Sequence, residues 1–400
     1  MKKFKLITFL GIRPDLIRMH KLIKLLDKGQ RENNYEHIFV HSGQHFDYEL
    51  DQVFYKELGI RPPDINLNIG KILKERGRTG QAYQSALLFE KTSEMIEKIN
   101  PNLVMYLGDT NTVTSALIVA KHKVPLAHIE GGGRSFDWRM PEEKNRIVID
   151  HLSDVLYVYL ERYKSLLLAE GVASFRVQVI GNIIVDALKS FLPLAQQSKI
   201  MANLGIVSKN YILCTMHREE NIENRAGFAS KIKDLAKLSK RFPVVFPIMP
   251  RVQSRLKEYR LLPVLSKANI ICEKPLGFLD FLKLEQNARF IVTDSGTVQE
   301  EALILGVPCL VCRASTERPE TIWAGATIMA DKNLYANAQK VLQIDKKWAS
   351  NILNPLGGSP SDRIFRDLVK KINSGFFSSS RDFKFLKANK FACQAYNYAR

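Results

Sequence analysis

Short apolar runs alternate along the chain with segments whose apolar residues recur every three or four positions. The short runs predict buried strands, and the longer spacing predicts helices that bury one face. In the first half of the chain, the predicted strands are Phe4–Leu10, His37–His41, Leu103–Leu107, Pro125–Ile129, Asp154–Tyr159 and Val177–Ile180. Alternation of strands with helices is typical of a largely parallel sheet that carries helices on both faces.

The same alternation starts again after a polar stretch from Gln196 to Asn210. The predicted strands of the second half are Tyr211–Thr215, Val244–Ile248, Ile270–Cys272, Phe290–Thr293 and Cys309–Val311. The 400 residues of the chain exceed what one hydrophobic core usually organises. We therefore predict an α/β protein of two doubly wound, Rossmann-like domains that face a cleft, over residues 1–185 and 186–372.

A basic aromatic tail follows over residues 373–400, where phenylalanines and tyrosines interleave with lysines and arginines. Such a mixture suits an anionic membrane surface or a docking partner. We prefer the simpler interpretation, in which the tail packs on its own protein or is partly disordered.

Charged residues gather directly after the predicted strands of both halves. The carboxyl ends of parallel strands form the edge at which open α/β sheets bind ligands. The residues at these positions are Asp109, Glu130, Glu142, His217, Glu219 and Glu220, together with Arg13, Arg134, Arg218, Arg251, Arg313 and Arg318. Taken singly, each has a structural explanation as a salt bridge, a helix cap or a solvated side chain. Their shared position favours acid–base chemistry on a nucleotide-linked substrate.

The run Asp294-Ser295-Gly296-Thr297 follows one of these strands and opens a helix. Backbone N–H groups at such a helix start can bind phosphate. Glu301, one turn into the helix, could accept hydrogen bonds from two ribose hydroxyls, as carboxylates do in dinucleotide sites. An ordinary N-capped turn explains the same residues, so this run alone leaves both interpretations open.

The net charge is +18, because lysine and arginine outnumber aspartate and glutamate by 59 to 41. This excess suits an anionic partner such as nucleic acid, an acidic membrane surface or a phosphorylated small molecule. The charges are scattered, and no zinc-finger, RNP or helix-turn-helix motif accompanies them, so we do not expect nucleic-acid binding.

Membrane insertion, secretion and metal binding are also not expected. No run approaches the ~20 apolar residues that span a bilayer, and Met1-Lys2-Lys3 leads into a strand rather than a signal peptide, which indicates a cytoplasmic protein. The cysteines lack metal-ligand spacing, which favours buried thiols over zinc or disulfides. They are Cys214, Cys272, Cys309, Cys312 and Cys393.

Eight motifs occur in one order between about Phe4 and Met329. They are Gly11-Ile12-Arg13-Pro14-Asp15, Ser42-Gly43-Gln44-His45, Gly108-Asp109-Thr110, His128-Ile129-Glu130-Gly131-Gly132, Pro141-Glu142-Glu143, His217-Arg218-Glu219-Glu220-Asn221, Asp294-Ser295-Gly296-Thr297-Val298-Gln299-Glu300-Glu301 and Thr316-Glu317-Arg318-Pro319-Glu320. In this order they resemble the serial motifs of the non-hydrolysing UDP-N-acetylglucosamine 2-epimerases. Any one motif would be weak evidence, whereas eight in order are specific.

The resemblance implies a glycosyltransferase-B-type fold, with UDP held mainly by the second domain and the sugar in the cleft. It also implies an elimination–addition reaction without NAD, metal or any other cofactor. UDP leaves to give a glycal and adds back after protonation on the opposite face. The implied partners are a UDP-sugar substrate and a second copy of the chain in a homodimer.

The resemblance also carries residue roles onto this chain. Asp109, Glu130 and Glu142 would be the acid–base carboxylates, and His217 a catalytic residue beside the diphosphate. UDP would be bound by Arg13, Arg218, Phe278, Ser295, Gly296, Glu301 and Arg313. Among these, Arg13, Ser295 and Gly296 would contact phosphate, and Glu301 the ribose.

The chain departs from the family pattern at several positions. Thr297 stands where a second glycine is expected, Asp15 replaces a glutamate, and Met249 replaces a histidine common in relatives. The loop between Glu130 and Glu142 is short. Together with the run 274–278, it looks more like relatives that act on modified amino sugars for capsule and O-antigen synthesis. Examples are UDP-2-acetamido-2,6-dideoxy-L-talose and UDP-diacetamido-uronic acids.

Three other functions fit parts of the sequence. A glycosyltransferase of the same fold would use the nucleotide site, a hydrolysing relative would let water trap the same pathway, and an inactive UDP-sugar sensor would keep only the binding residues. The presence of Asp109, Glu130 and Glu142 favours a 2-epimerase that supplies precursors for surface polysaccharides.

Overall fold

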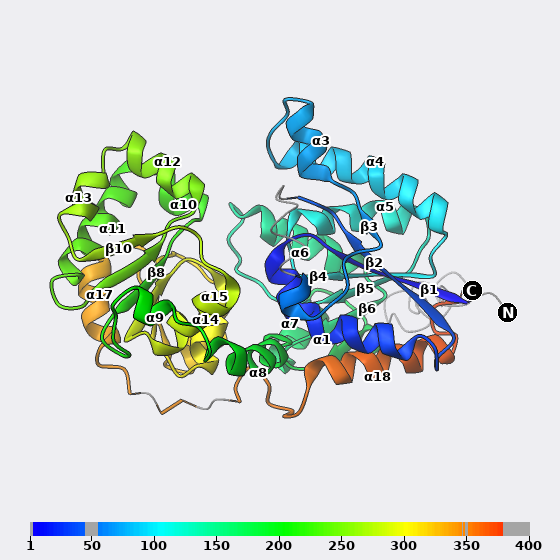
Figure 1. The fold of residues 1–400 in the computed structure, drawn as a ribbon. Coiled ribbons are helices and arrows are strands. Elements are labelled where there is room, and N and C mark those ends of the chain that lie inside the picture. Colours follow the sequence, from blue (N-terminus) through cyan, green and yellow to red (C-terminus); the bar gives the residue numbers. More distant parts are fainter. Residues whose placement is uncertain (1–2, 45–54, 346, 349–350, 379–400) are drawn as a thin grey trace. The chain divides into compact units, whose positions relative to one another are not determined.

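The computed structural model describes residues 3–44, 55–345, 347–348 and 351–378. The motif residue His45 and the tail beyond Ser378 lie outside the described residues. The chain forms two compact units. The first comprises Met1–Ala187 and the part from Asn354 onward, and the second is Leu188–Leu353. In each unit, helices flank a sheet (Figure 1).

The first unit is built on a seven-stranded sheet with the order β3-β2-β1-β4-β5-β6-β7. All of its strand pairs are parallel. Its strands are β1 (Phe4–Leu10), β2 (Tyr35–His41), β3 (Ile65–Asn66), β4 (Leu103–Leu107), β5 (Leu126–Ile129), β6 (Val155–Val158) and β7 (Val177–Val179). Its helices are α1 (Arg13–Gly29), α3 (Ile69–Glu75), α4 (Gln81–Ile99), η1 (Asn111–Ser115), α5 (Ala116–Lys121), α6 (Pro141–Leu152), α7 (Glu161–Ala169), η2 (Ser174–Arg176) and α18 (Pro360–Asn373). Helix α8 (Ile184–Ala195) contains the boundary between the units.

The second unit repeats this plan with a six-stranded parallel sheet of order β10-β9-β8-β11-β12-β13. Its strands are β8 (Ile212–Thr215), β9 (Val244–Pro247), β10 (Ile270–Glu273), β11 (Phe290–Thr293), β12 (Cys309–Val311) and β13 (Thr327–Met329). Its helices are α9 (Ile200–Asn203), α10 (Glu219–Ile222), α11 (Arg225–Leu238), α12 (Pro250–Glu258), α13 (Leu262–Ser266), α14 (Phe278–Asn287), α15 (Gly296–Ile304), α16 (Pro319–Trp323) and α17 (Leu334–Val341). This strand order is that of the Rossmann fold.

The central strands are apolar at successive positions because helices bury both faces of each sheet. In β8, Ile212 and Cys214 belong to one core cluster of the second unit, whereas Leu213 belongs to the cluster on the other face. β11 alternates in the same way, with Val292 in the first cluster and Ile291 in the second. These buried runs are what made the strands predictable from sequence.

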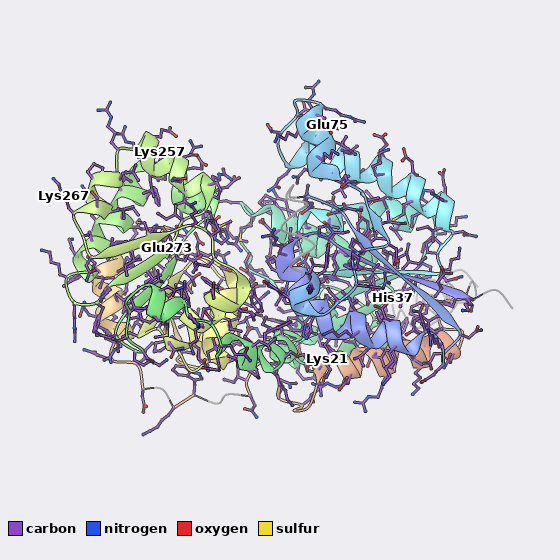
Figure 2. All side chains as sticks on the ribbon, in the orientation of Figure 1. Lys21, His37, Glu75, Lys257, Lys267 and Glu273 are labelled. Carbon is purple, nitrogen blue, oxygen red and sulfur yellow. The ribbon has the colours of Figure 1, made fainter. Side chains whose placement is uncertain are left out.

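Helix α18 packs in the first unit, whereas the strand–helix pattern of the sequence predicts a second domain over residues 186–372. The buried carboxylate of Asp186 accepts hydrogen bonds from Ser361 N at 2.8 Å and Ser359 Oγ at 3.0 Å. Lys21 on α1 (Figure 2) donates to Ser359 Oγ at 2.7 Å. The sequence shows the apolar face of α18 but not which sheet that face covers. The packing of α18 in the first unit therefore could not be predicted.

The expectation of buried thiols is correct for Cys214, Cys309 and Cys312 but wrong for Cys272, which is exposed. Cys272 lies on β10, which among the described residues is the edge strand of the second sheet. Cys393 lies outside the described residues. Within the described part of the chain, no helix has both the length and the apolarity needed to cross a bilayer.

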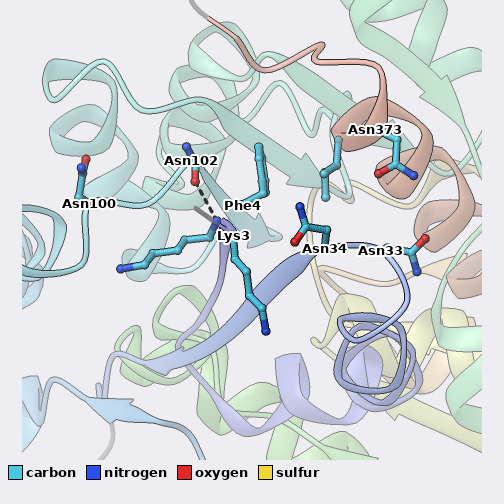
Figure 3. A pocket seen from close by; sticks show the side chains of 9 residues that line it. Lys3, Phe4, Asn33, Asn34, Asn100, Asn102 and Asn373 are labelled. Atoms are coloured by element: carbon cyan, nitrogen blue, oxygen red, sulfur yellow. Dashed lines mark hydrogen bonds between the residues drawn. The ribbon is translucent and has the colours of Figure 1, made fainter. Parts of the chain in front are cut away.

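A pocket of about 430 Å³ lies at the amino-terminal ends of β1, β2 and β4 (Figure 3). Lys3, Asn34, Asn102 and Asn373 are among its lining residues, and the backbone N–H of Lys5 donates to Asn102 Oδ1 at 2.8 Å. This edge of the sheet is opposite to the one where the predicted site residues lie.

We expect Asp186→Ala to lower the free energy of unfolding of the first unit. The substitution leaves the buried Ser361 N–H without its acceptor, which costs about 1–3 kcal/mol. Urea unfolding followed by circular dichroism measures the change. Asp186→Asn keeps an acceptor oxygen and should lose less, and equal stability of wild-type protein and Asp186→Ala would contradict the anchoring role.

Candidate active site

The predicted site residues flank the point in each sheet where the strand order reverses. β1 and β4 are neighbours in the first sheet, and β8 and β11 are neighbours in the second. Arg13 opens α1 after β1, and Asp109 follows β4; His217 follows β8, and Ser295 follows β11. Open α/β sheets bind ligands at this reversal, outside the carboxyl ends of the strands.

Asp109 and Glu130 follow directly paired positions of adjacent strands. Leu107 of β4 is in register with Ile129 of β5, and Gly108 N donates to Ile129 O at 3.0 Å. Glu130 is buried and has a φ of +77°, a backbone conformation that is unfavourable for a residue with a side chain. Such strain often marks functional positions, so it supports Glu130 as a site residue.

A guanidinium group holds the carboxylate of Glu130. Arg18 on α1 forms a buried ion pair with Glu130, and Tyr159 Oη donates to the same carboxylate at 3.1 Å. Arg18 also contacts Asp15 at 3.1 Å, and Asp15 accepts long 3.3 Å hydrogen bonds from Gly11 N and Ile12 N. The start of α1 is thereby joined to the end of β5.

A second guanidinium group holds Asp109. Arg146 on α6 pairs with Asp109 and with Glu143, the latter at 2.6 Å. Asn145 Nδ2 donates to the backbone oxygen of Asp109 at 3.0 Å. Glu142 is the second residue of α6 and is half-buried.

Glu143 fixes the short loop that precedes α6. Its carboxylate accepts from Ser135 N at 3.0 Å and from Phe136 N at 2.9 Å. Burial alone would raise the pKa of Glu143, but these backbone hydrogen bonds and the Arg146 guanidinium outweigh it and lower that pKa. Glu143 is therefore a loop-positioning carboxylate, a role that its place in the first turn of a helix did not reveal.

Asp150 fixes the glycine-rich segment after Glu130. It is fully buried and accepts from His128 Nδ1 at 2.8 Å, Gly132 N at 3.0 Å and the guanidinium Nη1 of Arg134 at 2.7 Å. His128 Nε2 in turn contacts Gly108 O at 2.8 Å. Arg134, a candidate cation in the sequence, is thus part of this structural network.

In the second unit, Asp294 joins the end of β8 to the end of β11. This buried carboxylate accepts from His217 N, Arg218 N and Asn221 Nδ2, each at 2.9 Å. His217 Nδ1 is 3.3 Å from Asp294, and the imidazole is exposed. His217 therefore has a fixed backbone and an accessible ring.

The start of α15 is surrounded by arginines and glutamates. Ser295 is the N-cap of α15 and accepts from Val298 N at 3.5 Å. A Cβ at Gly296 would come within 2.6 Å of a Glu317 carboxylate oxygen, so a larger residue does not fit without movement. Glu317 contacts Arg313 at 2.8 Å and Arg218 at 3.5 Å.

Further ion pairs balance the charge at this helix start. Arg313 is also 3.4 Å from Glu220, and Arg318 pairs with Glu300 at 2.5 Å. An arriving anion would therefore compete with Glu220 and Glu317 for Arg313. By contrast, Arg251 is exposed and pairs with Glu219 and Glu223.

Glu301 and Phe278 lie on the adjacent helices α15 and α14. Glu301 is in the second turn of α15 and is 5% exposed. Phe278 opens α14, and its ring packs edge-on against Phe191 with centroids 5.3 Å apart. Met249, the expected histidine position, is exposed at the N-cap of α12.

The comparisons with known proteins agree over most of the chain. A family model described as UDP-N-acetylglucosamine 2-epimerase matches residues 27–368. This chain belongs to that family. It is 38% identical over 374 residues to the UDP-N-acetylglucosamine 2-epimerase of Methanocaldococcus jannaschii, covering 91% of this chain and 99% of that protein.

Two further comparisons place the chain within the UDP-N-acetylglucosamine 2-epimerase family. A crystal structure of the M. jannaschii enzyme in complex with UDP-GlcNAc and UDP superposes with a TM-score of 0.83 and 36% identity, over 92% of this chain and 100% of that one. The UDP-2,3-diacetamido-2,3-dideoxy-D-glucuronate 2-epimerase of Pseudomonas aeruginosa is 33% identical, over 92% of this chain and 99% of that protein.

Family membership confirms several predictions. The two doubly wound, Rossmann-like domains of a glycosyltransferase-B-type fold are confirmed, and the chain is an enzyme of the isomerase class. The roles of individual residues stay predictions. The structure brings Asp109 together with Arg146, and Glu130 with Arg18, two arginines that the sequence analysis did not single out.

We expect Asp15 to make stability depend on pH. Burial raises the pKa of Asp15 from its ordinary 3.8 to about 6, against the opposing effect of Arg18 and two backbone amides. Between these values the folded protein binds more protons than the unfolded chain, so the contribution of Asp15 to stability falls as pH rises from about 4 to about 6.

Asp15→Asn removes this titration and keeps the shape of the side chain. Relative to Asp15→Asn, the wild-type protein should lose on the order of 3 kcal/mol of unfolding free energy as the pH rises from about 4 to about 7. Urea titrations at the two pH values measure it. A difference that stays constant would show that Asp15 has an ordinary pKa.

Proposed function

We propose that this chain is a non-hydrolysing 2-epimerase of a UDP-N-acetyl amino sugar, of the UDP-GlcNAc to UDP-ManNAc type. The observation that carries the proposal is the pair of carboxylates, Asp109 and Glu130, on adjacent strand ends, each held by a buried arginine. The name of the M. jannaschii relative supports the same substrate.

The chemistry requires groups that remove and return a proton at C2. Because that proton is not acidic, its removal is coupled to departure of UDP, which breaks the C1–O bond and leaves a C1=C2 double bond in the glycal. The reverse steps deliver a proton to the opposite face of C2 and re-form the C1–O bond with UDP. We assign Asp109, Glu130 and Glu142 to these proton transfers.

The second unit supplies groups suited to the UDP part of the substrate. Ser295 and the amide of Gly296 at the start of α15 suit a phosphate, and the accessible ring of His217 suits a catalytic contact beside the diphosphate. We assign UDP contacts also to Arg13, Arg218, Phe278, Glu301 and Arg313, with Glu301 at the ribose. This route uses no NAD and no metal ion.

A modified amino sugar is the second candidate substrate. The short loop before α6 favours it, because this loop resembles that of relatives that act on modified amino sugars. Glu143 holds the backbone of the loop, and Phe136 and Trp138 are 72% and 65% exposed. The P. aeruginosa relative is named for a diacetamido uronic acid. UDP-2-acetamido-2,6-dideoxy-L-talose is the other modified sugar we propose.

The cellular setting of the enzyme is also a proposal. We infer that it works in the cytoplasm as a homodimer and supplies precursors for surface polysaccharides such as capsule or O-antigen. The support for this is the resemblance of its motifs to enzymes of those pathways.

Proton NMR of the purified protein with UDP-GlcNAc in D₂O tests the function. We expect deuterium to enter C2 and the manno epimer to appear, since the C2 proton is lost to a carboxylate that exchanges with solvent. UDP binding without exchange would transfer the proposal to the modified sugars. Release of free UDP and sugar without an epimer would indicate a hydrolase instead.

Asp109→Asn should lower kcat by ~100-fold or more while UDP affinity stays near the wild-type value, because acid–base catalysis is lost and the nucleotide contacts are kept. The NMR assay gives the rate, and calorimetry gives the affinity. Asp331→Asn, a half-exposed aspartate of the second unit, is the matched control and should keep full activity. Unchanged turnover of Asp109→Asn would remove Asp109 from the mechanism.

A further inference from the structure

Tyr159 lies directly beyond the carboxyl end of β6 and is almost completely buried, with 1% of its surface exposed. Ile180 N donates to Val158 O at 2.8 Å, and Gly181 N donates to Tyr159 O at 3.1 Å, so the segment after β7 holds the backbone at this point. Because β5 and β6 are adjacent parallel strands, Tyr159 and Glu130 lie at the same edge of the sheet. Neither the strand pattern nor the motifs of the sequence pointed to this residue.

The hydroxyl of Tyr159 donates to one particular oxygen of Glu130. Tyr159 Oη is 3.1 Å from Glu130 Oε2, and Arg18 Nη1 of α1 pairs with the same oxygen. A Cβ on Gly108, which follows β4, would lie 3.8 Å from Oε2. Groups from three separate segments therefore surround Oε2, and a proton could bind to this oxygen only by displacing one of its donors.

Charge balance explains why a neutral donor suits this position. Arg18 also pairs with the buried carboxylate of Asp15 at 3.1 Å, so one guanidinium group serves two acids. A second cation beside Glu130 would strongly favour its ionised form, whereas a reversible proton transfer needs both forms to be accessible. A phenol adds no charge, and it can donate either to the carboxylate or to the C=O oxygen of the protonated acid.

We propose that Tyr159 is a positioning residue that holds Oε2 of Glu130, so that the other oxygen, Oε1, transfers the C2 proton of the sugar. The inference rests on the proposed function, because it takes Glu130 as one of the acids that react at C2. When Glu130 acts as the base, the C2–H bond breaks, Oε1 gains the proton, and UDP leaves with the electron pair of the C1–O bond. When it acts as the acid, Oε1 gives the proton to C2. Tyr159 keeps its own proton in both directions.

Tyr159→Phe tests the proposal, because it removes the hydroxyl group and keeps the ring. The assay is epimerisation of UDP-GlcNAc, or of the modified sugar that the wild-type protein accepts, followed by proton NMR in D₂O. We expect kcat to fall by about tenfold or more, the effect of losing a hydrogen bond to a charged group. KM and the affinity for UDP should stay at the wild-type values, because the hydroxyl acts through Glu130 and the nucleotide contacts are kept.

The pH dependence of kcat is a second readout. A phenol stabilises the ionised form of Glu130 more than the neutral form, so its loss should move the limb of the profile that reports Glu130 to higher pH, by about one unit. Arg18, Asp15 and Asp109, the charged groups on the neighbouring segments, are the same in both proteins. A role of Tyr159 in packing alone would leave this limb in place.

Tyr35→Phe is the matched control. Tyr35 is a fully buried residue of the same sheet, and its hydroxyl donates to Leu26 O at 2.7 Å. It stands at the start of β2, at the edge opposite to the site. Each phenylalanine variant loses one buried hydrogen bond and should lose a similar free energy of unfolding, about 1 kcal/mol. Tyr35→Phe should keep the wild-type kcat and pH profile.

An unchanged kcat in Tyr159→Phe would overturn the inference. A raised KM with an unchanged kcat would also overturn it, since Tyr159 would then bind the substrate directly. A lower kcat with an unmoved pH profile, or an equal loss of kcat in Tyr35→Phe, would show a packing role instead. A wild-type protein that brings no deuterium into C2 of UDP-GlcNAc or of the modified sugars would overturn the proposed function, and this inference with it.

Discussion

Buried carboxylates that accept backbone hydrogen bonds hold the strand-end segments of this enzyme in place. A carboxylate removed from water must find donors, and N–H groups of irregular segments need acceptors, so each satisfies the other. Glu143 holds the loop before α6, Asp150 the glycines after Glu130, and Asp294 the segment after β8. Glu130 and His217 stand on segments without regular secondary structure, and Asp150 and Asp294 fix the backbone next to them.

Arginine side chains pair with acids of both kinds, those that hold loops and those assigned to proton transfer, since Glu143 contacts Arg146 and Asp150 contacts Arg134. The three loop-holding acids are set apart by the backbone N–H groups that donate to them. Asp109 and Glu130 are paired with arginine side chains, and Tyr159 also donates to Glu130. Side-chain partners can shift during a reaction more easily than a backbone that is part of a loop. This contrast gives a physical basis for separating reacting from structural carboxylates where the sequence shows only acids after strands.

Much of the fold was predictable because strands buried on both faces are continuous apolar runs. Strands β3 and β13 were missed, and the two residues of β3 are too few to show a periodicity. In the site, the positions after the strands were predictable from the alternation and the motifs. The partners of those residues were not, because Arg18 and Arg146 occur within helical segments and the acid or loop that each contacts depends on how helices pack on the sheet.

The assignment of α18 to the first unit has a consequence for the order of folding during synthesis. All of the second unit lies within one uninterrupted stretch, Leu188–Leu353, whereas the first unit closes only when α18 has been made. Ser359 and Ser361 are 173 and 175 residues beyond Asp186. At ribosomal rates they emerge about 10 to 35 s later. The first unit, whose translation begins first, is thus completed last. Until α18 has been made, the surface of α1 that it will cover is accessible to chaperones.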